Sequence, residues 1–422
     1  MKQKVYPWLI VLCCCGQAAA FLGFTNNCSG VFFAHVAEEL QTGIGNISFY
    51  LTIINLLTGF LAPTAVKLFG RLDARLLVLI AASASALGYF GMSRASSVWQ
   101  IYLAACIIGV AGAFYGTAII SLFIGRWFHS RMGLVMGFTF CASGLMGAVM
   151  SPFFNSVIES AGWRTGYLYG AIFVFVTLLP SAMLLHLLPS RLGLTAYGHV
   201  TEPKASSPTA SSEPSASSAN ASDSPASGAP WRKMLLLACL INFAAYFIMG
   251  ISTHISNYAV TIGLTTQMGA YLISSIMVGN TLSKLLAGFL CDAISPKRTC
   301  ALSTALVAVG LALLVLFGNS GSGSFFALAL GGVLTGITYS VGTVTLSTYV
   351  KQIFGLERSG VVYAKVSAVG SVSSAIAYTA IGVSFDLFGS YAPAILFCMA
   401  LSLIALLCVF GISACEARLQ RQ

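Results

Sequence analysis

Residues 201–230 read TEPKASSPTASSEPSASSANASDSPASGAP, a tract of small residues and proline near the middle of a 422-residue chain. A segment of this composition cannot bury a core, so we expect residues 189–232 to form a disordered linker. The linker divides the chain into two parts, 1–188 and 233–422, whose composition is strongly apolar. It therefore predicts two folded units joined by a flexible connection.

Apolar residues dominate both parts. The AVILMFWYC set makes up 57% of the chain and charged residues only 8%, whereas a soluble domain carries roughly 25% charged residues. The apolar residues form repeated runs of about 20, the length that an α-helix needs to cross a bilayer. The composition excludes a soluble protein and indicates an integral membrane protein, with the lipid bilayer as its first partner.

A window of about 19 residues places six apolar spans before the linker and six after it. They lie at 7–35, 45–66, 76–92, 98–123, 132–156 and 165–188, and at 234–257, 268–290, 299–318, 325–350, 361–384 and 391–413. We predict an all-α membrane protein with twelve transmembrane helices in two six-helix bundles. The first span is too long for a secretory signal, so we expect it to be retained as a helix.

The basic residues indicate an orientation, because cytoplasmic loops retain Lys and Arg. With both termini inside, nearly all the loop cations fall on the cytoplasmic side, and Arg94 and Arg164 fall outside. The net charge of +10 is spread over many short loops, so it does not indicate nucleic-acid binding. We expect a multi-pass protein of the cell inner (plasma) membrane with both termini in the cytoplasm.

The sequence offers no catalytic or metal-binding constellation. Its twelve cysteines lie mostly inside apolar spans without ligand-like spacing, which is typical of packing residues. The glycine-rich runs lack the ending of a phosphate-binding loop. We expect no metal, no cofactor and no enzymatic activity.

Three short matches indicate an internal repeat. NLLTGFLA at 55–62 is similar to KLLAGFLC at 284–291, a separation of 229 residues. Arg131 and Arg358 begin two further matching segments at a separation of 227, and Glu159 then falls on Asp386. These matches predict duplication of a six-helix unit, with the two copies running parallel because six is even.

Two cations, Lys284 and Lys365, fall inside predicted spans. A Lys within the bilayer costs about 2.5 to 3.5 kcal/mol on insertion scales, so it normally faces a cavity or a partner. All eleven acidic residues lie at span ends, in loops, in the linker or in the tail. An unpaired buried cation is expensive, and an anionic substrate would supply the missing countercharge. Snorkelling of either Lys towards the interface is the alternative.

These features resemble a known family of transporters. Two six-helix halves, a long linker and a charged loop after the second helix of each half resemble the major facilitator superfamily; the loop residues are Lys67, Gly70, Arg71 and Arg75, and Asp292, Lys297 and Arg298. The segment RWFHSRMG at 126–133, followed by GFTFCASGLMGAVMSPF, is similar to the oxalate/formate antiporter and monocarboxylate transporter branch. The resemblance implies a two-bundle secondary transporter.

The resemblance also implies a cytoplasmic gate. The superfamily loop has an Asp four residues after a Gly, which the second half keeps as Gly288 and Asp292, whereas Gly59 is followed by Pro63. We therefore expect Asp292, Arg131 and Arg358 to act in gating, with the second-half gate better supported than the first.

Within this branch, cations on the eighth and eleventh helices hold a small carboxylate, and Lys284 and Lys365 occupy those helices. Two family positions are neutral here: Asn280 replaces an Asp four residues before the cation, and Asn27 replaces a first-helix Lys. Both departures favour anion exchange or uniport over proton symport. Lys284 itself replaces the Arg of the oxalate carrier, and Lys lacks the bidentate fork of Arg, which argues against oxalate specifically.

Neutral groups are expected to complete the pocket by packing on the ligand and donating hydrogen bonds. By depth we select Tyr115, Tyr339, Tyr363, Asn27 and Asn280; Tyr339 also resembles a family site tyrosine by position. The alternative for each is packing alone.

Two histidines are candidates for proton coupling. His35 and His254 lie near the outer ends of the first and seventh helices, and a His titrates near neutrality. Hydrogen-bonded structural roles are the alternative for both.

Together these observations predict a secondary transporter of small organic anions, monocarboxylates or dicarboxylates, that works by alternating access and anion exchange. Its partner is a small carboxylate, and we expect it to act as a monomer. A proton-coupled monocarboxylate symporter is the alternative within transport. A transporter-like receptor and a channel are the alternatives from other classes.

Overall fold

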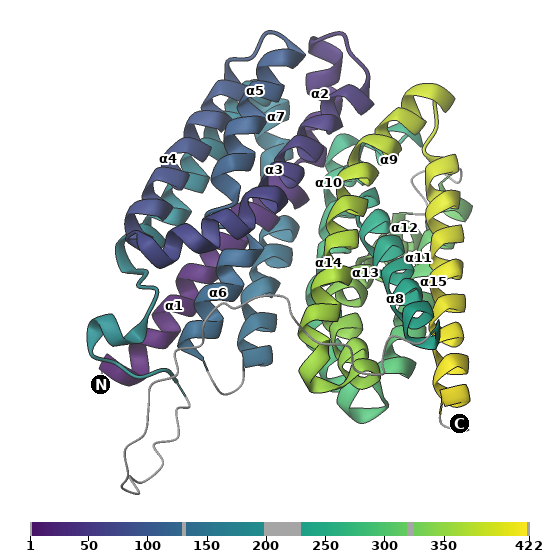
Figure 1. Ribbon diagram of the computed structural model, residues 1–422. Coiled ribbons are helices and arrows are strands. Elements are labelled where there is room, and N and C mark those ends of the chain that lie inside the picture. Colours follow the sequence, from purple (N-terminus) through teal and green to yellow (C-terminus); the bar gives the residue numbers. More distant parts are fainter. Residues whose placement is uncertain (1, 129–131, 198–228, 319–324, 420–422) are drawn as a thin grey trace, which may run out of the picture.

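The computed structural model describes residues 2–128, 132–197, 229–318 and 325–419. It shows two helical bundles side by side, the N-bundle (2–197) and the C-bundle (229–419) (Figure 1). Both ends of the chain lie at the same end of the molecule (Figure 1). We call this end the terminus side and the opposite end the far side.

The N-bundle consists of eight helical elements and a short 3-10 helix. They are α1 (Lys2–Ala18), the π-helix η1 (Ala19–Asn27), α2 (Gly30–Glu39), α3 (Ile44–Arg71), α4 (Ala74–Ser93), α5 (Val98–Gly112), α6 (Thr117–Trp127), α7 (Met132–Leu184) and η2 (Pro189–Leu192). An isolated bridge joins Phe128 to Tyr197.

The C-bundle repeats this pattern. It contains α8 (Ala229–Met249), α9 (Ile251–Thr261), α10 (Thr266–Ala293), α11 (Pro296–Phe317), α12 (Phe325–Gly336), α13 (Thr338–Ser340), the π-helix η4 (Val341–Thr345), α14 (Leu346–Phe388) and α15 (Ala392–Leu419).

The prediction of twelve membrane-spanning helices is confirmed. Eleven helices of the described residues are long and apolar enough to cross a membrane. The longest candidate, Leu134–Leu184, turns at Gly162, where φ is +81°. Only glycine adopts this conformation without strain, so α7 consists of two helices that cross the membrane separately.

The ends of the predicted linker belong to the bundles. Residues 189–197 pack against the N-bundle through η2 and the Tyr197 backbone, whose N–H donates to the Trp127 carbonyl at 2.8 Å. The helix α8 begins at Ala229, four residues before the boundary predicted from composition. Residues 198–228 lie outside the described residues, so the predicted disorder is not addressed there.

The first, fourth, seventh and tenth membrane helices are all interrupted. The first changes to a π-helix at Ala19 and breaks before Gly30. The fourth breaks between α5 and α6, the seventh at Gly250 between α8 and α9, and the tenth around α13 and η4. Interrupted helices at the interface of two repeats are typical of transporter binding sites, because unwound turns free backbone groups for ligands.

The buried core shows which parts of the bundles are joined. One apolar cluster contains residues of both bundles, including Tyr50 and Ile54 of α3, Met277 of α10 and Ile381 of α14. Each of the other two clusters is confined to one bundle and consists of residues from the terminus-side halves of its helices. Phe69 and Trp127 belong to the cluster of the N-bundle, and Tyr349 belongs to that of the C-bundle. The bundles therefore form one core on the far side and separate cores on the terminus side.

Close backbone approach seals the far side. A Cβ at Gly30 of α2 would lie only 2.1 Å from the carbonyl oxygen of Thr253 in α9, so a larger residue at position 30 would push the bundles apart. The hydroxyl of Ser274 donates to the Ala148 carbonyl at 2.6 Å, and that of Thr52 to the Ala375 carbonyl at 2.5 Å. The conformation is closed on the far side.

The structure corrects the register of the repeat in one place. The helices α3 and α10 both have 28 residues, and each is followed by a two-residue connection and a capped helix. Their first residues, Ile44 and Thr266, are 222 apart, as are their last residues, Arg71 and Ala293. The sequence match at 229 is thus displaced by seven residues, about two helical turns, because two similar apolar stretches on the same helix face were aligned. The separation of 227 holds at the end of α7, as shown below.

Candidate functional site

Lys284 lies on the face of α10 that meets the N-bundle. Met277 and Thr281 contact Gly147 and Gly144 of α7 across the interface, and Lys284 follows them by seven and three residues. At about 100° per residue, it shares their stripe of the helix. The Thr281 carbonyl, which accepts from the Cys141 thiol at 3.8 Å, is one turn before Lys284. Lys284 therefore lies at the terminus-side limit of the contacts that close the far side between α10 and α7.

Lys284 is buried without a carboxylate. Its exposed fraction is 7%, and within the described ranges the salt bridges are Arg75–Asp73 and Arg164–Glu39, both remote from it in sequence and at helix ends. Its Nζ lies 5.6 Å from the centroid of the Tyr339 ring. A cation–π contact of this kind contributes about 0.5 to 2 kcal/mol, so it offsets only part of the cost of burial.

Tyr339 connects this cation to the N-bundle. Its hydroxyl is 2.8 Å from the Ser252 Oγ and donates to the Asn27 Oδ1 at a long 3.5 Å. Asn27 is 3% exposed, and its Nδ2 donates to the Ser143 carbonyl at 3.0 Å. The structure therefore brings together three predicted site residues, Lys284, Tyr339 and Asn27, at the contact between the bundles.

Asn280 is one turn before Lys284 on α10 and is fully buried. Its Nδ2 contacts the Met277 Sδ at 3.7 Å, and its Oδ1 has no hydrogen-bond partner. An unpaired buried acceptor costs about 1 to 3 kcal/mol, so the site retains an unused hydrogen-bonding group close to the cation.

Lys365 occupies a different environment from Lys284. It is exposed on α14, ten residues before Ala375, which contacts Thr52 of the N-bundle. Ten residues correspond to about 15 Å along the axis and a rotation of about 80° from the interface stripe. Measured from the far-side helix ends, Lys284 lies about 27 Å deep and Lys365 about 34 Å deep, so Lys365 flanks the interface nearer the terminus side.

The other two predicted tyrosines use their hydroxyls within one bundle. The Tyr363 hydroxyl donates to the Gly342 and Thr343 carbonyls, both at 3.1 Å, and so satisfies the backbone of η4. Tyr115 is completely buried in the N-bundle with its hydroxyl 2.9 Å from the Ser85 Oγ. Substrate contact by either stays a prediction, and in this conformation each has a structural partner.

The predicted gating residues are only partly described. Asp292 is exposed in the last turn of α10 on the terminus side. Arg131 lies outside the described residues, as does the side chain of Arg358. Gating by these three residues therefore stays a prediction.

The two histidines differ in burial. His254 is 1% exposed at the far-side contact, where its Nε2 is 2.8 Å from the Tyr378 carbonyl and the Phe33 ring packs on it at 5.3 Å. His35 is half-buried on α2. The described contacts of His254 support a hydrogen-bonded structural role in the closed far side.

Sequence reasoning missed a polar network beside Asn27. The Asn26 Oδ1 accepts from the Asn55 Nδ2 at 2.9 Å and from the Tyr378 hydroxyl at 3.4 Å. Because Asn26 and Asn55 belong to the N-bundle and Tyr378 to the C-bundle, this is a further polar contact between the bundles. Two consecutive asparagines, Asn26 and Asn27, inside an apolar span are the sequence feature that could have predicted this network.

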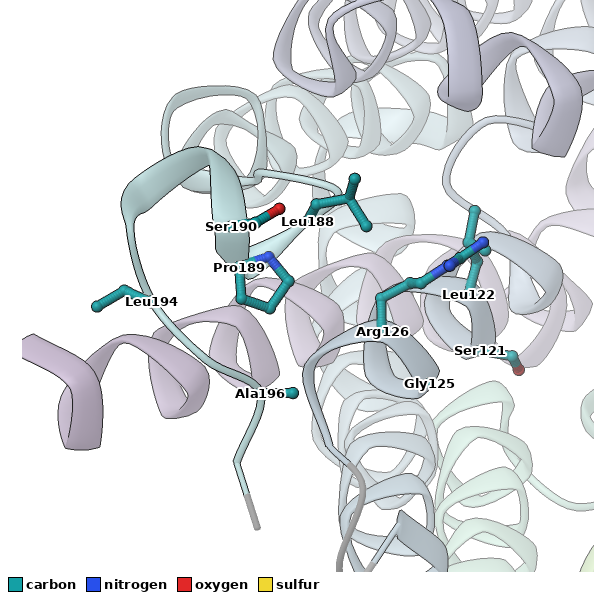
Figure 2. A pocket seen from close by; sticks show the side chains of 9 residues that line it. All are labelled: Ser121, Leu122, Gly125, Arg126, Leu188, Pro189, Ser190, Leu194 and Ala196. Atoms are coloured by element: carbon teal, nitrogen blue, oxygen red, sulfur yellow. The ribbon is translucent and has the colours of Figure 1, made fainter. Parts of the chain in front are cut away.

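The described residues also contain a surface pocket of about 560 Å³ away from this interface. Figure 2 shows its lining, which comes from α6, including Arg126, and from the segment around Pro189 and Ser190. No residue predicted to bind substrate lines it. No group of three His, Cys, Asp or Glu side chains able to hold a metal gathers in the described ranges.

The arrangement suits capture of a small anion. A desolvated ammonium interacts strongly with a carboxylate because the local dielectric is low, and the aromatic face of Tyr339 and the amides of Asn27 and Asn280 supply packing and orientation. The far side is closed, so a route to this ammonium would have to lead from the terminus side.

Comparison with known proteins places the chain in a family. The Major Facilitator Superfamily sequence profile matches residues 14–280 and 267–418. Among solved structures, a point mutant of the nucleoside transporter NupG superposes with a TM-score of 0.70 at 11% identity, covering 96% of this chain and 99% of NupG. The latter likeness shows the fold alone.

Relatives of known sequence are distant. Monocarboxylate transporter 12 of Homo sapiens is 22% identical over 303 residues, which are 68% of this chain and 57% of that protein. Monocarboxylate transporter 2 of Rattus norvegicus is 26% identical over 145 residues, 34% of this chain and 30% of that protein. The uncharacterized MFS-type transporter YhjX of Escherichia coli (strain K12) is 22% identical, with 79% and 78% covered. The chain thus spans less than two thirds of the length of the two monocarboxylate transporters.

Proposed function

Because the chain belongs to the Major Facilitator Superfamily, we propose that it is a secondary transporter of small organic anions that works by alternating access. Members of this superfamily are transporters, which confirms the expectation that the chain is not an enzyme. The distant similarity to monocarboxylate transporters supports a small carboxylate, a monocarboxylate first, as the substrate class. We propose the plasma membrane, a cytoplasmic terminus side and a monomer for the working protein.

One observation carries the proposal most strongly. Lys284 is buried on the face that joins the bundles and has no carboxylate partner among the described side chains. A buried cation without a counterion is destabilising by several kcal/mol. A bound carboxylate removes that cost, so affinity for an anion follows from the same feature that makes the empty site unfavourable.

The mechanism follows from where this cation lies. In the conformation described, an anion enters from the terminus side and pairs with Lys284, while Asn27 and Tyr339 hold it against the N-bundle. Charge neutralisation then lets the terminus-side halves approach and the far side open. Without an anion, the unpaired Lys284 ammonium at the contact between the bundles opposes closure of the terminus-side halves over it, which favours exchange over net flux.

Counterflow in proteoliposomes tests this function. Vesicles preloaded with unlabelled oxalate, formate, lactate, pyruvate or succinate are given each labelled acid at symmetric pH. We expect internal carboxylate to stimulate uptake at least several-fold in the wild type and not in Lys284→Gln, which serves as the matched control because it keeps much of the side-chain length and removes the charge.

Two results would contradict the proposal. Uptake that appears only with an inward proton gradient would favour a proton-coupled symporter over exchange. Binding of an acid without any uptake in either direction would favour a receptor.

A further inference from the structure

Acidic side chains join the two bundles at two places on the far side. Asp386, near the end of α14, accepts hydrogen bonds from the backbone N–H groups of Ile44 and Gly45 at 2.9 and 2.8 Å. These are the first two residues of α3 in the other bundle. Glu159 of α7 accepts a hydrogen bond from the hydroxyl of Thr266, the first residue of α10. Each bundle thus holds the start of the second helix of the other bundle with a carboxylate.

The internal repeat relates the two contacts. Glu159 and Asp386 are 227 residues apart, and each stands three residues before a glycine of positive φ, Gly162 at +81° and Gly389 at +65°. Ile44 and Thr266 are the first residues of helices of equal length. A pair of acidic residues that the sequence matches therefore contacts the start of the equivalent helix of the other bundle twice, through backbone N–H groups at α3 and through a hydroxyl at α10.

The geometry favours a carboxylate at the start of α3, where the donors are backbone N–H groups. The first N–H groups of a helix have no partner within it, and they carry the positive end of the helix dipole. A charged acceptor makes shorter and stronger hydrogen bonds to them than a neutral one. The fit around Asp386 is close, because a Cβ added at Gly43 would lie 2.5 Å from its Oδ2.

We propose that Asp386 and Glu159 are gating residues that hold the far side closed. The partners of each carboxylate belong to the opposite bundle, so both contacts must break when the far side opens. An amide one turn before Glu159 on α7 supports the second contact: the Asn155 Nδ2 donates to the Gln267 Oε1 of α10 at 3.0 Å. This role rests on alternating access in the proposed function and on no particular substrate.

Hydrogen–deuterium exchange of the full chain in nanodiscs tests this role, because amide exchange reports the population of open states. The variants are Asp386→Asn and Glu159→Gln, and Glu38→Gln is the matched control, since Glu38 is an exposed far-side carboxylate outside both contacts. In either single variant we expect exchange to rise about tenfold at the starts of both α3 and α10. Peptides covering 64–71 and 286–293 on the terminus side should become more protected, and Glu38→Gln should change neither region.

The remote helix start is the decisive readout. Faster exchange confined to the helix that lost its own carboxylate, with the other helix start and the terminus side unchanged, would show local capping and overturn the gating role. Gly43→Ala provides a second variant that keeps every charge and displaces the Asp386 carboxylate from α3. It should reproduce the Asp386→Asn pattern, and a wild-type pattern in Gly43→Ala would equally contradict the proposal.

Discussion

The helices α3 and α10 occupy equivalent places in the two bundles and differ in one decisive residue. Both have 28 residues, and both begin on the far side next to a carboxylate of the other bundle. In the register set by their ends, Lys284 of α10 corresponds to Ala62 of α3. The internal repeat has kept the scaffold and its far-side contacts, whereas of these two helices only α10 carries a buried cation.

This difference assigns separate tasks to the bundles. In the site we propose, the C-bundle supplies the charge through Lys284, and the N-bundle supplies neutral amides, Asn26, Asn27 and Asn55, that are hydrogen-bonded to each other or to backbone. A site with one buried cation suits a single carboxylate. The comparison therefore connects the asymmetry of the repeat to the valence of the substrate.

Removing the charge of Lys284 would abolish the charge difference between α3 and α10, and it should have the largest effect on carboxylate exchange. Truncating one partner of a buried charge pair typically costs about 2 to 5 kcal/mol, so Lys284→Gln should raise the KM for carboxylate exchange at least about 30-fold. Lys284→Arg, which keeps the charge, should retain exchange within about fivefold. Equal loss in Gln and Arg variants would indicate that packing, not charge, matters at this position.

Adding a cation to the N-bundle would remove the asymmetry in the other direction. Ala62 follows Asn55 by two turns on the same face of α3, so Ala62→Lys should place a second ammonium at the position of the N-bundle that is equivalent to Lys284. We expect the preference of exchange to shift about tenfold from monocarboxylates towards dicarboxylates such as succinate. Ala62→Gln is the control, and an identical shift in that variant would remove the electrostatic explanation.

Tyr339 sharpens the comparison because it contacts both Lys284 of the C-bundle and the neutral Asn27 of the N-bundle. Tyr339→Phe removes the hydroxyl that contacts Ser252 and Asn27 and keeps the ring under Lys284. A typical neutral hydrogen bond contributes about 1 kcal/mol, so the KM should rise about three- to sixfold. Tyr339→Leu, which also removes the ring, should raise it further; equal effects of the two variants would mean that the cation–π contact contributes nothing.

The smallest effect concerns a surface ion pair that the C-bundle lacks among its described residues. Arg164 donates a hydrogen bond to Glu39 and holds the pKa of that carboxyl below its usual range, with help from the Trp163 indole. Glu39 lies outside the candidate spans. Because the pKa is lowered on folding, the contribution to stability is present above the unfolded pKa of about 4.3 and disappears as the pH falls through the folded pKa.

Thermal unfolding of Glu39→Gln measures this contribution. The variant should melt slightly below the wild type at pH 7, since exposed ion pairs contribute little, and the difference should vanish in acid below the usual carboxyl range. A difference that is constant with pH would show that the hydrogen bonds of Glu39, rather than its charge, are responsible.

Much of the fold could be predicted from the sequence for a physical reason. The bilayer imposes a minimum apolar length on every helix, so the spans were visible in composition alone, and the cost of burial made Lys284 conspicuous among apolar residues. The same logic could not place Lys365, because a Lys near a helix end satisfies the insertion cost whether it faces the interface or flanks it.

The parts that could not be predicted depend on packing between helices. Sequence similarity aligned Asn55 with Lys284. A shift of seven residues, about two helical turns, keeps the same residues on the same helix face, so the apolar pattern does not reveal it. The helix ends fix the register. The hydrogen bonds of Tyr363 depend on the π-helix η4. The sequence of residues 341–345 does not predict a π-helix. Asn26 joins the two bundles through the hydroxyl of Tyr378, and these two residues are far apart in the sequence.

The central claim is that Lys284 is the counterion of a bound carboxylate, and one binding experiment tests it most directly. Equilibrium dissociation constants of lactate and of its neutral amide, lactamide, are measured with purified wild type and Lys284→Gln. The account predicts that the wild type prefers the acid by at least about 30-fold and that this preference falls close to one in the variant, because ligand charge and Lys284 act as a pair. A preference for the acid that survives unchanged in Lys284→Gln would contradict the claim.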